Sequence, residues 1–168
     1  MTSIRPESPS DRDAVRAVHL ASFPTNAEAR LVELLRDGGH LTVSLVAEVD
    51  GEVVGHIAFS AVTTALGAVG LGLAPLAVMP THRRRGIAAR LVRQGIATAA
   101  ALGFGWAVVL GAPSYYGRYG FRPASEVGLM DEYGGGDAFQ VLEIVPGSLP
   151  YGAGLVRYAQ EFAAAGRS

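Results

Sequence analysis

The turn around Arg83, Gly86 and Ala88 is the part of the sequence whose residue types point most directly to chemistry. Three consecutive arginines stand here, between an apolar run and a helical pattern. The first turn of a helix has unpaired N–H groups and about half a positive charge, so it attracts anions. Glycine lets a ligand approach the backbone closely, and alanine leaves space beside it. The segment therefore predicts a site for an anion such as a diphosphate.

Two common phosphate-binding motifs do not fit this turn. The chain has no lysine, which excludes a P-loop, and it lacks the dinucleotide fingerprint G-x-G-x-x-G. A solvated basic cluster or a nucleic-acid patch is the alternative interpretation. The net charge of −1, without basic residues interleaved among aromatic ones, argues against nucleic acid.

Composition excludes several other kinds of chemistry. The chain has no cysteine, so disulfides, iron–sulfur clusters and a cysteine nucleophile are excluded. The absence of lysine also excludes a Schiff-base mechanism. No two histidines share ligand spacing with a carboxylate, and we therefore expect no metal site. Hydrophobic residues make up 49% of the chain and charged residues 17%, which indicates a folded globular domain rather than a disordered chain.

The small net charge hides an uneven distribution. Residues 53–125 contain seven arginines and no acidic residue. Residues 123–156 contain no arginine but five acidic residues, which are Glu126, Asp131, Glu132, Asp137 and Glu143. A basic middle followed by an acidic segment predicts two ligands of different charge, or two ends of one site. An ordinary fluctuation of surface charge is the alternative.

The elements that position the basic turn begin with two predicted helices. The first begins at Ser8 before Pro9, or at Ser10, and its apolar stripe stops at Pro24. The second follows a capping signal at Thr25 and ends near residue 38.

Strands follow the helices and lead into the turn. The β-branched run Leu41–Val49, an Asp-Gly pair at 50–51 and the run Val53–Ser60 predict a hairpin. Leu71–Met79 is predicted to be a third strand, in which Pro75 marks a bulge or an edge.

A long helix from near Arg84 to Gly103 follows the turn, and then a buried strand at 105–111. The buried face of this helix is predicted to hold Ala88, Leu91, Val92, Gly95, Ala99 and Leu102. Later segments are a short helix at 114–119, strands at 126–130 and 139–145 separated by a mobile loop at 133–136, and a strand or helix at 155–162. This order predicts an α/β (α+β) fold with a mixed sheet, and one domain over residues 1–168.

Taken together, these segments resemble the GNAT-type N-acetyltransferases. The pattern Val78-x-Pro80 followed by Arg83-x-x-Gly86-x-Ala88 is similar to that family's acetyl-coenzyme A motif. A buried strand at 106–110 and the pattern A-P-x-Y-Y-x-x-x-G-F at 112–121 stand where the family has its second motif. The resemblance covers residues 2–145 and is less certain over 146–168. The 112–121 pattern, with G-H-I at 55–57, is similar to an uncharacterised bacterial branch labelled YhbS-like.

The resemblance implies a fold and a co-substrate. The fold is a central mixed, mostly antiparallel sheet that is splayed at a β-bulge and flanked by helices on both faces. The co-substrate is acetyl-CoA: strand backbone pairs with its pantetheine arm, and helix amides hold its diphosphate near the arginines. The residues implied to bind it are Leu76, Ala77, Val78, Arg83, Arg84, Arg85, Gly86, Ile87, Ala88, Ala89 and Tyr116.

Tyr116 matches the family's tyrosine four residues before Gly-Phe, and the resemblance implies that it is the general acid for the departing thiolate. The alternatives are that Tyr116 is a core tyrosine with a satisfied hydroxyl, or that the neighbouring Tyr115 holds the role.

A proton acceptor is also required, because an alkylamine with a pKa near 10 is neutral in only about one molecule in a thousand at pH 7. Glu48 and His56 on the predicted hairpin are the candidate general bases. The alternatives are a hydrogen-bonded core histidine and a solvated carboxylate. His19, His40 and His82 are less favoured.

The resulting hypothesis is an enzyme that transfers acetyl from acetyl-CoA to a primary amine by direct attack in a ternary complex. The amine belongs to an unidentified small molecule or peptide, and Asp131 and Glu132 are candidates to bind it. A non-catalytic acyl-CoA-binding or sensing domain and a structural α/β domain are the alternatives. We expect a cytoplasmic monomer or homodimer with no nucleic-acid partner and no membrane span.

Overall fold

The computed structural model describes residues 1–166, and the chain divides into two compact units. The first unit comprises Met1–Phe59, Ala74–Ala97 and the segment that begins at Gln160. The second comprises Ser60–Leu73 and Thr98–Ala159. The expectation of one domain over residues 1–168 stays a prediction, and the two units are described in turn.

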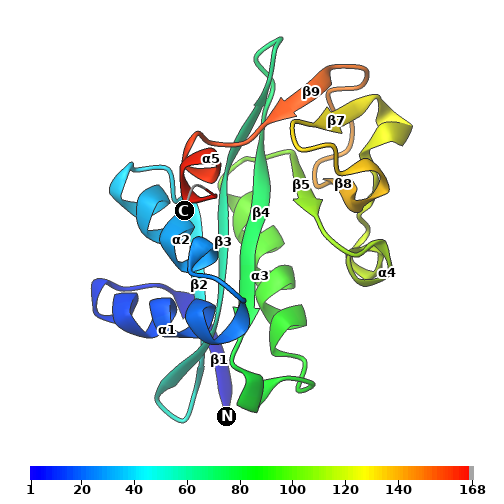
Figure 1. The fold of residues 1–168 in the computed structure, drawn as a ribbon. Helices are drawn as coiled ribbons and strands as arrows, with labels where there is room; N and C mark the ends of the chain where they lie inside the picture. Colours follow the sequence, from blue (N-terminus) through cyan, green and yellow to red (C-terminus); the bar gives the residue numbers. More distant parts are fainter. Residues whose placement is uncertain (167–168) are drawn as a thin grey trace. The chain divides into compact units, whose positions relative to one another are not determined.

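The first unit combines an antiparallel part of the sheet with the longer helices. Its elements are β1 (Thr2–Pro6), η1 (Pro9–Asp11), α1 (Arg12–Ser22), α2 (Ala27–Asp37), β2 (Val43–Val49), most of β3 (Glu52–Thr64), the end of β4 (Val69–Val78), η2 (Pro80–His82), most of α3 (Ile87–Ala101) and α5 (Glu161–Ala165). The strands β1, β2 and β3 pair antiparallel in that order, with Val46 opposite His56. Figure 1 shows α1 and α2 as neighbouring helices, with α5 beside α2.

Local signals explain where the first helices begin. The Ser8 N–H donates to the Asp11 carboxylate at 2.7 Å and Pro9 follows at the first helical position, so Ser8 rather than Ser10 starts the helical segment. The Thr25 hydroxyl accepts the N–H of Ala27 at 3.2 Å, at the start of α2.

The strand β3 lies between helices within the first unit. Side chains alternate along a strand, so His56 points to one face while Gly55 and Phe59 point to the other. His56 meets His19 of α1. A Cβ at Gly55 would lie 3.1 Å from Leu91 of α3, and one at Gly95 of α3 would meet the Phe59 ring. This packing confirms helices on both faces of the sheet.

The second unit holds the remaining, shorter strands. Its elements are the end of β3, the start of β4, β5 (Trp106–Leu110), α4 (Pro113–Tyr116), η3 (Gly117–Tyr119), β6 (Arg122–Pro123), η4 (Ala124–Val127), β7 (Leu129–Asp131), η5 (Gly136–Ala138), β8 (Phe139–Glu143) and β9 (Gly154–Arg157). The strands β4 and β5 are parallel, as the predicted βαβ connection requires, while β8 is antiparallel to β5 and β6. The predicted mixed, mostly antiparallel sheet is confirmed.

Several expected details differ in the structure. Leu102 lies beyond the end of α3 and is 55% exposed, whereas Ile87, absent from the predicted buried face, is 2% exposed. The predicted strand at 126–130 begins within the short helix η4, and only its last two residues belong to a strand, β7, which starts at Leu129. The ambiguous segment 155–162 contains the end of a strand and the start of a helix. None of the helices in residues 1–166 has the length and apolarity needed to cross a membrane.

Candidate functional site

The N-terminus of α3 is open to a ligand. Gly86 has φ = +76°, a conformation that favours glycine, and a Cβ built on it would meet nothing within 4 Å. The first helical hydrogen bond runs from the Arg90 N–H to the Gly86 carbonyl at 3.1 Å. The amides of residues 86–89 therefore precede the helical ladder and can donate to an anion.

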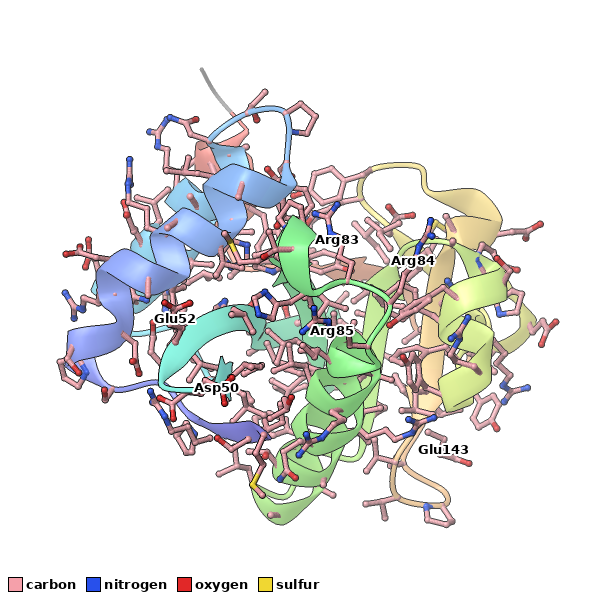
Figure 2. The ribbon with its side chains drawn as sticks, turned by 90° about the horizontal axis from the view of Figure 1, so that it is seen from below. Asp50, Glu52, Arg83, Arg84, Arg85 and Glu143 are labelled. Atoms are coloured by element: carbon pink, nitrogen blue, oxygen red, sulfur yellow. The ribbon has the colours of Figure 1, made fainter. Side chains whose placement is uncertain are left out.

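The three arginines before this helix differ in their roles. Arg83 Nε donates to the Val78 carbonyl at 3.1 Å and fastens the turn to the end of β4. Arg84 has φ = +64°, and Arg84 and Arg85 are exposed. Figure 2 shows the three side chains leaving the turn in different directions. Arg84 and Arg85 can add positive potential for an anion, while Arg83 also holds the backbone in place.

The end of β4 is anchored on β3. The Met79 N–H donates to the Val54 carbonyl at 2.7 Å, and a Cβ at Gly55 would lie 3.4 Å from the Ala77 carbonyl oxygen. Ala77 and Val78 are buried, and Leu76 is half-buried. The Ala74–Pro75 peptide bond is cis, where the sequence predicts a bulge or an edge. The predicted splay of the sheet there stays a prediction.

Tyr116 lies in an aromatic cluster of the second unit. Its ring contacts Tyr115 edge-on at 4.9 Å and Phe121 at 5.8 Å between centroids. Gly111 gives the ring room, since a Cβ there would collide with it. Burial, followed by the neighbouring Tyr115, raises the pKa of Tyr116 to about 12. Its hydroxyl therefore keeps its proton at neutral pH and can donate it to a strong base.

The neighbouring Tyr115 has other partners. Its hydroxyl accepts a hydrogen bond from the Tyr119 hydroxyl at 2.8 Å, and the Arg118 guanidinium lies 4.5 Å from its ring centroid. A hydrogen bond and a cation–π contact hold this side chain in place. These contacts leave the hydroxyl proton of Tyr115 free to donate, so Tyr115 stays the alternative proton donor.

The two candidate bases lie in different surroundings of the first unit. His56 is fully buried, and its two ring nitrogens lie 2.8 Å from His19 Nε2 and 2.8 Å from Ser44 Oγ. Glu48 accepts a hydrogen bond from Arg5 at 3.0 Å, and its side chain is 31% exposed. Arg5 also forms a two-point contact with Asp11, whose pKa is lowered chiefly by that hydrogen bond.

Glu48 faces a surface cavity of about 410 Å³ within the first unit. Arg5, Asp11, Glu52 and Met79 also line it. Figure 2 shows Glu52 and Asp50 at the turn between β2 and β3. Glu48 is thus accessible to a small molecule but is already paired.

The two predicted substrate-binding carboxylates have structural partners in the second unit. Asp131 accepts the N–H groups of Tyr133 at 3.1 Å and Gly135 at 2.8 Å, which holds the glycine-rich segment expected to be mobile. Glu132 accepts the Tyr158 N–H at 2.8 Å. Their role toward a substrate stays a prediction.

Three polar residues around His56 did not stand out in the sequence. His19 carried a weak signal, because it lies on the apolar stripe of α1 beside Val15 and Val18. Ser44 and Glu7 carried none. Of the other histidines, His40 pairs with Glu161 at 2.5 Å and His82 with Thr81 at 2.8 Å. Within residues 1–166, no three His, Asp or Glu side chains are grouped so that they could hold a metal ion.

Comparisons with known proteins agree on one family. The family model described as Acetyltransferase (GNAT) family matches residues 12–121. Uncharacterized N-acetyltransferase YhbS of Escherichia coli (strain K12) is 39% identical over 162 residues, 95% of this chain and 97% of the relative. A crystal structure of Escherichia coli YhbS in complex with CoA has 38% identity and a TM-score of 0.92, over 96% of this chain and 92% of that one. A Brucella melitensis GNAT family acetyltransferase in complex with acetyl-CoA has 35% identity and a TM-score of 0.81, over 96% and 98%.

Proposed function

This chain belongs to the GNAT family of acetyltransferases and is an N-acetyltransferase that uses acetyl-CoA, and we propose that it transfers the acetyl group to a primary amine by direct attack. The observation that carries the proposal is the open N-terminus of α3, where Gly86 leaves the first-turn amides accessible. The diphosphate of acetyl-CoA binds these amides, and Arg84 and Arg85 add to the positive potential.

The acetyl thioester lies along the end of β4. Backbone groups of Leu76, Ala77 and Val78 pair with the pantetheine arm as an added strand does. An amide of Leu76 or Ala77 polarises the acetyl carbonyl, where negative charge develops during attack. The hydrogen bonds from Met79 and Arg83 support this role, because they fix the backbone at the end of the strand.

Tyr116 donates a proton to the departing thiolate. Burial raises the pKa of this hydroxyl, so its proton is present over the whole physiological range, while the role itself rests on the match of Tyr116 to the family's tyrosine. The acetyl group passes directly to the amine, and the chain has no cysteine that could carry it as a thioester.

The attacking amine loses a proton, for which His56 and Glu48 are the candidate acceptors. Glu48 already accepts a hydrogen bond from Arg5 at 3.0 Å, so one of its oxygens is occupied. His56 stands one residue from Gly55, whose Cβ position approaches the Ala77 carbonyl. The place of His56 on β3, the strand paired with β4, favours His56 and the groups bonded to it.

The acceptor is a cationic small molecule or peptide that approaches the acidic segment 123–156. Electrostatic attraction of the acceptor by these carboxylates weakens when salt is added and when the carboxylates are neutralised by substitution. We expect KM for the best amine to rise at high salt, and to rise in Asp131→Asn/Glu132→Gln. The melting temperature checks the fold, and Asp13→Asn, an exposed acid outside this segment, is the control. An unaltered KM in both comparisons, or a neutral or anionic best acceptor, would contradict this proposal.

We propose that the protein acts in the bacterial cytoplasm as a monomer or homodimer. The bacterial sources of its relatives support the bacterial part of this proposal.

An amine panel with acetyl-CoA, followed by thiol release, tests the proposed function. We expect at least one amine to raise thiol release well above the rate of acetyl-CoA hydrolysis. Tight binding of acetyl-CoA without transfer to any amine would instead indicate a sensing domain.

A further inference from the structure

A chain of hydrogen bonds crosses the interior of the first unit. His19 Nε2 lies 2.8 Å from His56 Nδ1, His56 Nε2 lies 2.8 Å from Ser44 Oγ, and Ser44 Oγ donates to Glu7 Oε1 at 3.1 Å. Arg36 completes the chain with an ion pair to Glu7. We call His19, His56, Ser44 and Glu7 the buried relay; they come from α1, β3, β2 and the residue after β1.

The Glu7 carboxylate determines which group donates in each hydrogen bond of the buried relay. An ionised carboxylate only accepts hydrogen bonds, so the Ser44 hydroxyl must donate to Glu7. That hydroxyl has one proton, and it therefore accepts from His56 Nε2–H.

The same argument determines which nitrogen of each imidazole carries the proton. A neutral imidazole carries one N–H, which leaves His56 Nδ1 as a lone pair. His19 Nε2–H must then donate to it, so His19 Nδ1 is also a lone pair.

His19 Nδ1 is where the buried relay lacks a partner. It is a buried atom without a hydrogen bond within the described residues, on a side chain that is 0% exposed. A buried acceptor left unpaired is destabilising, and such atoms are rare in folded proteins. The position calls for an N–H or O–H donor from a ligand or a water.

The open end lies near the strand that the proposed function assigns to the thioester. One turn of α1 beyond His19, the Ser22 hydroxyl lies 3.4 Å from the Val78 carbonyl. His56 follows Gly55, whose Cβ position is 3.4 Å from the Ala77 carbonyl oxygen. The Ser22 contact thus places α1, the helix that carries His19, beside the last residue of β4, and His56 lies on β3, the strand paired with β4.

We propose that the buried relay takes up the proton that the attacking amine loses, through a water bound at His19 Nδ1, and delivers it to Glu7. The proposal rests on the proposed function and names the proton path for the same reaction. In this proposal His19 receives the proton first, and His56 passes it from His19 to Ser44.

The proton transfers balance along the path. The amine N–H bond breaks, the proton crosses the water and a His19 Nδ1–H bond forms. His19 then gives its Nε2 proton to His56 Nδ1, and His56 gives its Nε2 proton to Ser44. Ser44 gives its hydroxyl proton to Glu7, which becomes a neutral carboxylic acid. His19, His56 and Ser44 each end with the number of protons that they had at the start.

The charges around the buried relay fit transport rather than storage of a proton. Burial lowers the pKa of His19 to about 4. Burial, followed by the charges of His19 and Arg36, lowers the pKa of His56 well below its ordinary value. Both rings are therefore neutral at pH 7, with the acceptor lone pairs present. Arg36 pairs with Glu7 at the far end of the buried relay.

Nitrogen NMR of the ¹⁵N-labelled full-length protein tests the relay independently of catalysis. We expect the neutral forms of both histidines to carry the proton on Nε2, with Nδ1 unprotonated. A proton on Nδ1 of either ring would overturn the relay even in an active enzyme. An absence of transfer to any amine would overturn the proposed function and, with it, the task assigned to the relay.

Kinetics of matched variants tests the proton path. His19→Gln keeps an N–H donor for His56 but cannot relay a proton, so we expect kcat to fall about 10²-fold while KM for acetyl-CoA is unchanged. Ser44→Ala breaks the path and Ser44→Thr restores its hydroxyl, so we expect kcat to fall in the first and recover in the second. A wild-type kcat in folded His19→Gln, or equal losses in Ser44→Ala and Ser44→Thr, would overturn the proposal.

Discussion

Gly86 is the residue at which one substitution should remove acetyl-CoA binding. In Gly86→Glu a carboxylate would stand where the diphosphate must approach, and we expect binding to be abolished in calorimetry. Gly86→Ala carries the same backbone strain at φ = +76° without the charge, and it should retain most of the affinity. Wild-type affinity in Gly86→Glu would show that the cofactor binds elsewhere.

Substitution of Tyr116 tests whether its hydroxyl donates a proton in the chemical step. Tyr116→Phe keeps the ring in its aromatic cluster and removes only the hydroxyl. We expect kcat to fall about 10²–10⁴-fold while the affinity for acetyl-CoA stays nearly unchanged. Tyr115→Phe is the matched control and should have a smaller effect. An unchanged kcat in Tyr116→Phe, with chemistry rate-limiting, would remove this hydroxyl from the mechanism.

The sequence predicts individual residues well where one backbone feature is decisive. A glycine after an arginine run and before an apolar helix stripe was enough to locate the turn at Gly86. The buried relay could not be predicted, because its members are far apart in the sequence and only the pairing of β2 with β3 aligns Ser44 with His56.

At the scale of elements, the packing of α3 on β3 depends on Gly95. Replacing glycine by alanine inside a helix normally raises the free energy of unfolding by about 1 kcal/mol. Here its methyl group would collide with the Phe59 ring, and overpacking costs about 1–3 kcal/mol. We therefore expect Gly95→Ala to lower the free energy of unfolding by about 1 kcal/mol in a urea titration.

A double-mutant cycle provides the control for this contact. Phe59→Leu shortens the opposing side chain, so Gly95→Ala should cost less in that background than in the wild type. An equal cost in both backgrounds would mean that the two residues do not touch.

The type of each long element follows from the sequence, but its ends depend on backbone geometry. The helix expected from Arg84 begins at Ile87, because both Arg84 and Gly86 have positive φ and cannot belong to it. The glycines at 133–136 predict a mobile segment, whereas the Asp131 carboxylate accepts hydrogen bonds from two of its amides.

At the scale of the whole molecule, buried neutral histidines make stability depend on pH. The pKa of His19 is lowered from about 6.5 to about 4 on folding, so the unfolded chain binds a proton that the native one does not. Stability is therefore full above pH 6.5 and is lost as the pH falls toward 4, by about 3 kcal/mol for this group. Urea titrations at pH 7 and pH 5 measure the trend.

His19→Gln should flatten this pH dependence between pH 7 and pH 5, where carboxylates titrate little. Val18→Ala, in the same helix but without a titratable group, should leave the pH dependence as in the wild type. An unchanged slope in His19→Gln would mean that His19 is protonated in the folded protein.

The central claim is that acetyl passes from acetyl-CoA to an amine without resting on the protein. A single-turnover reaction with enzyme in excess over acetyl-CoA, quenched over time and followed by mass spectrometry of protein and amine, tests it directly. We predict an acetylated amine, free CoA and a protein of unchanged mass at every time point. An acetylated protein that forms before the product and then decays would contradict direct transfer, as would CoA release without any acetylated amine.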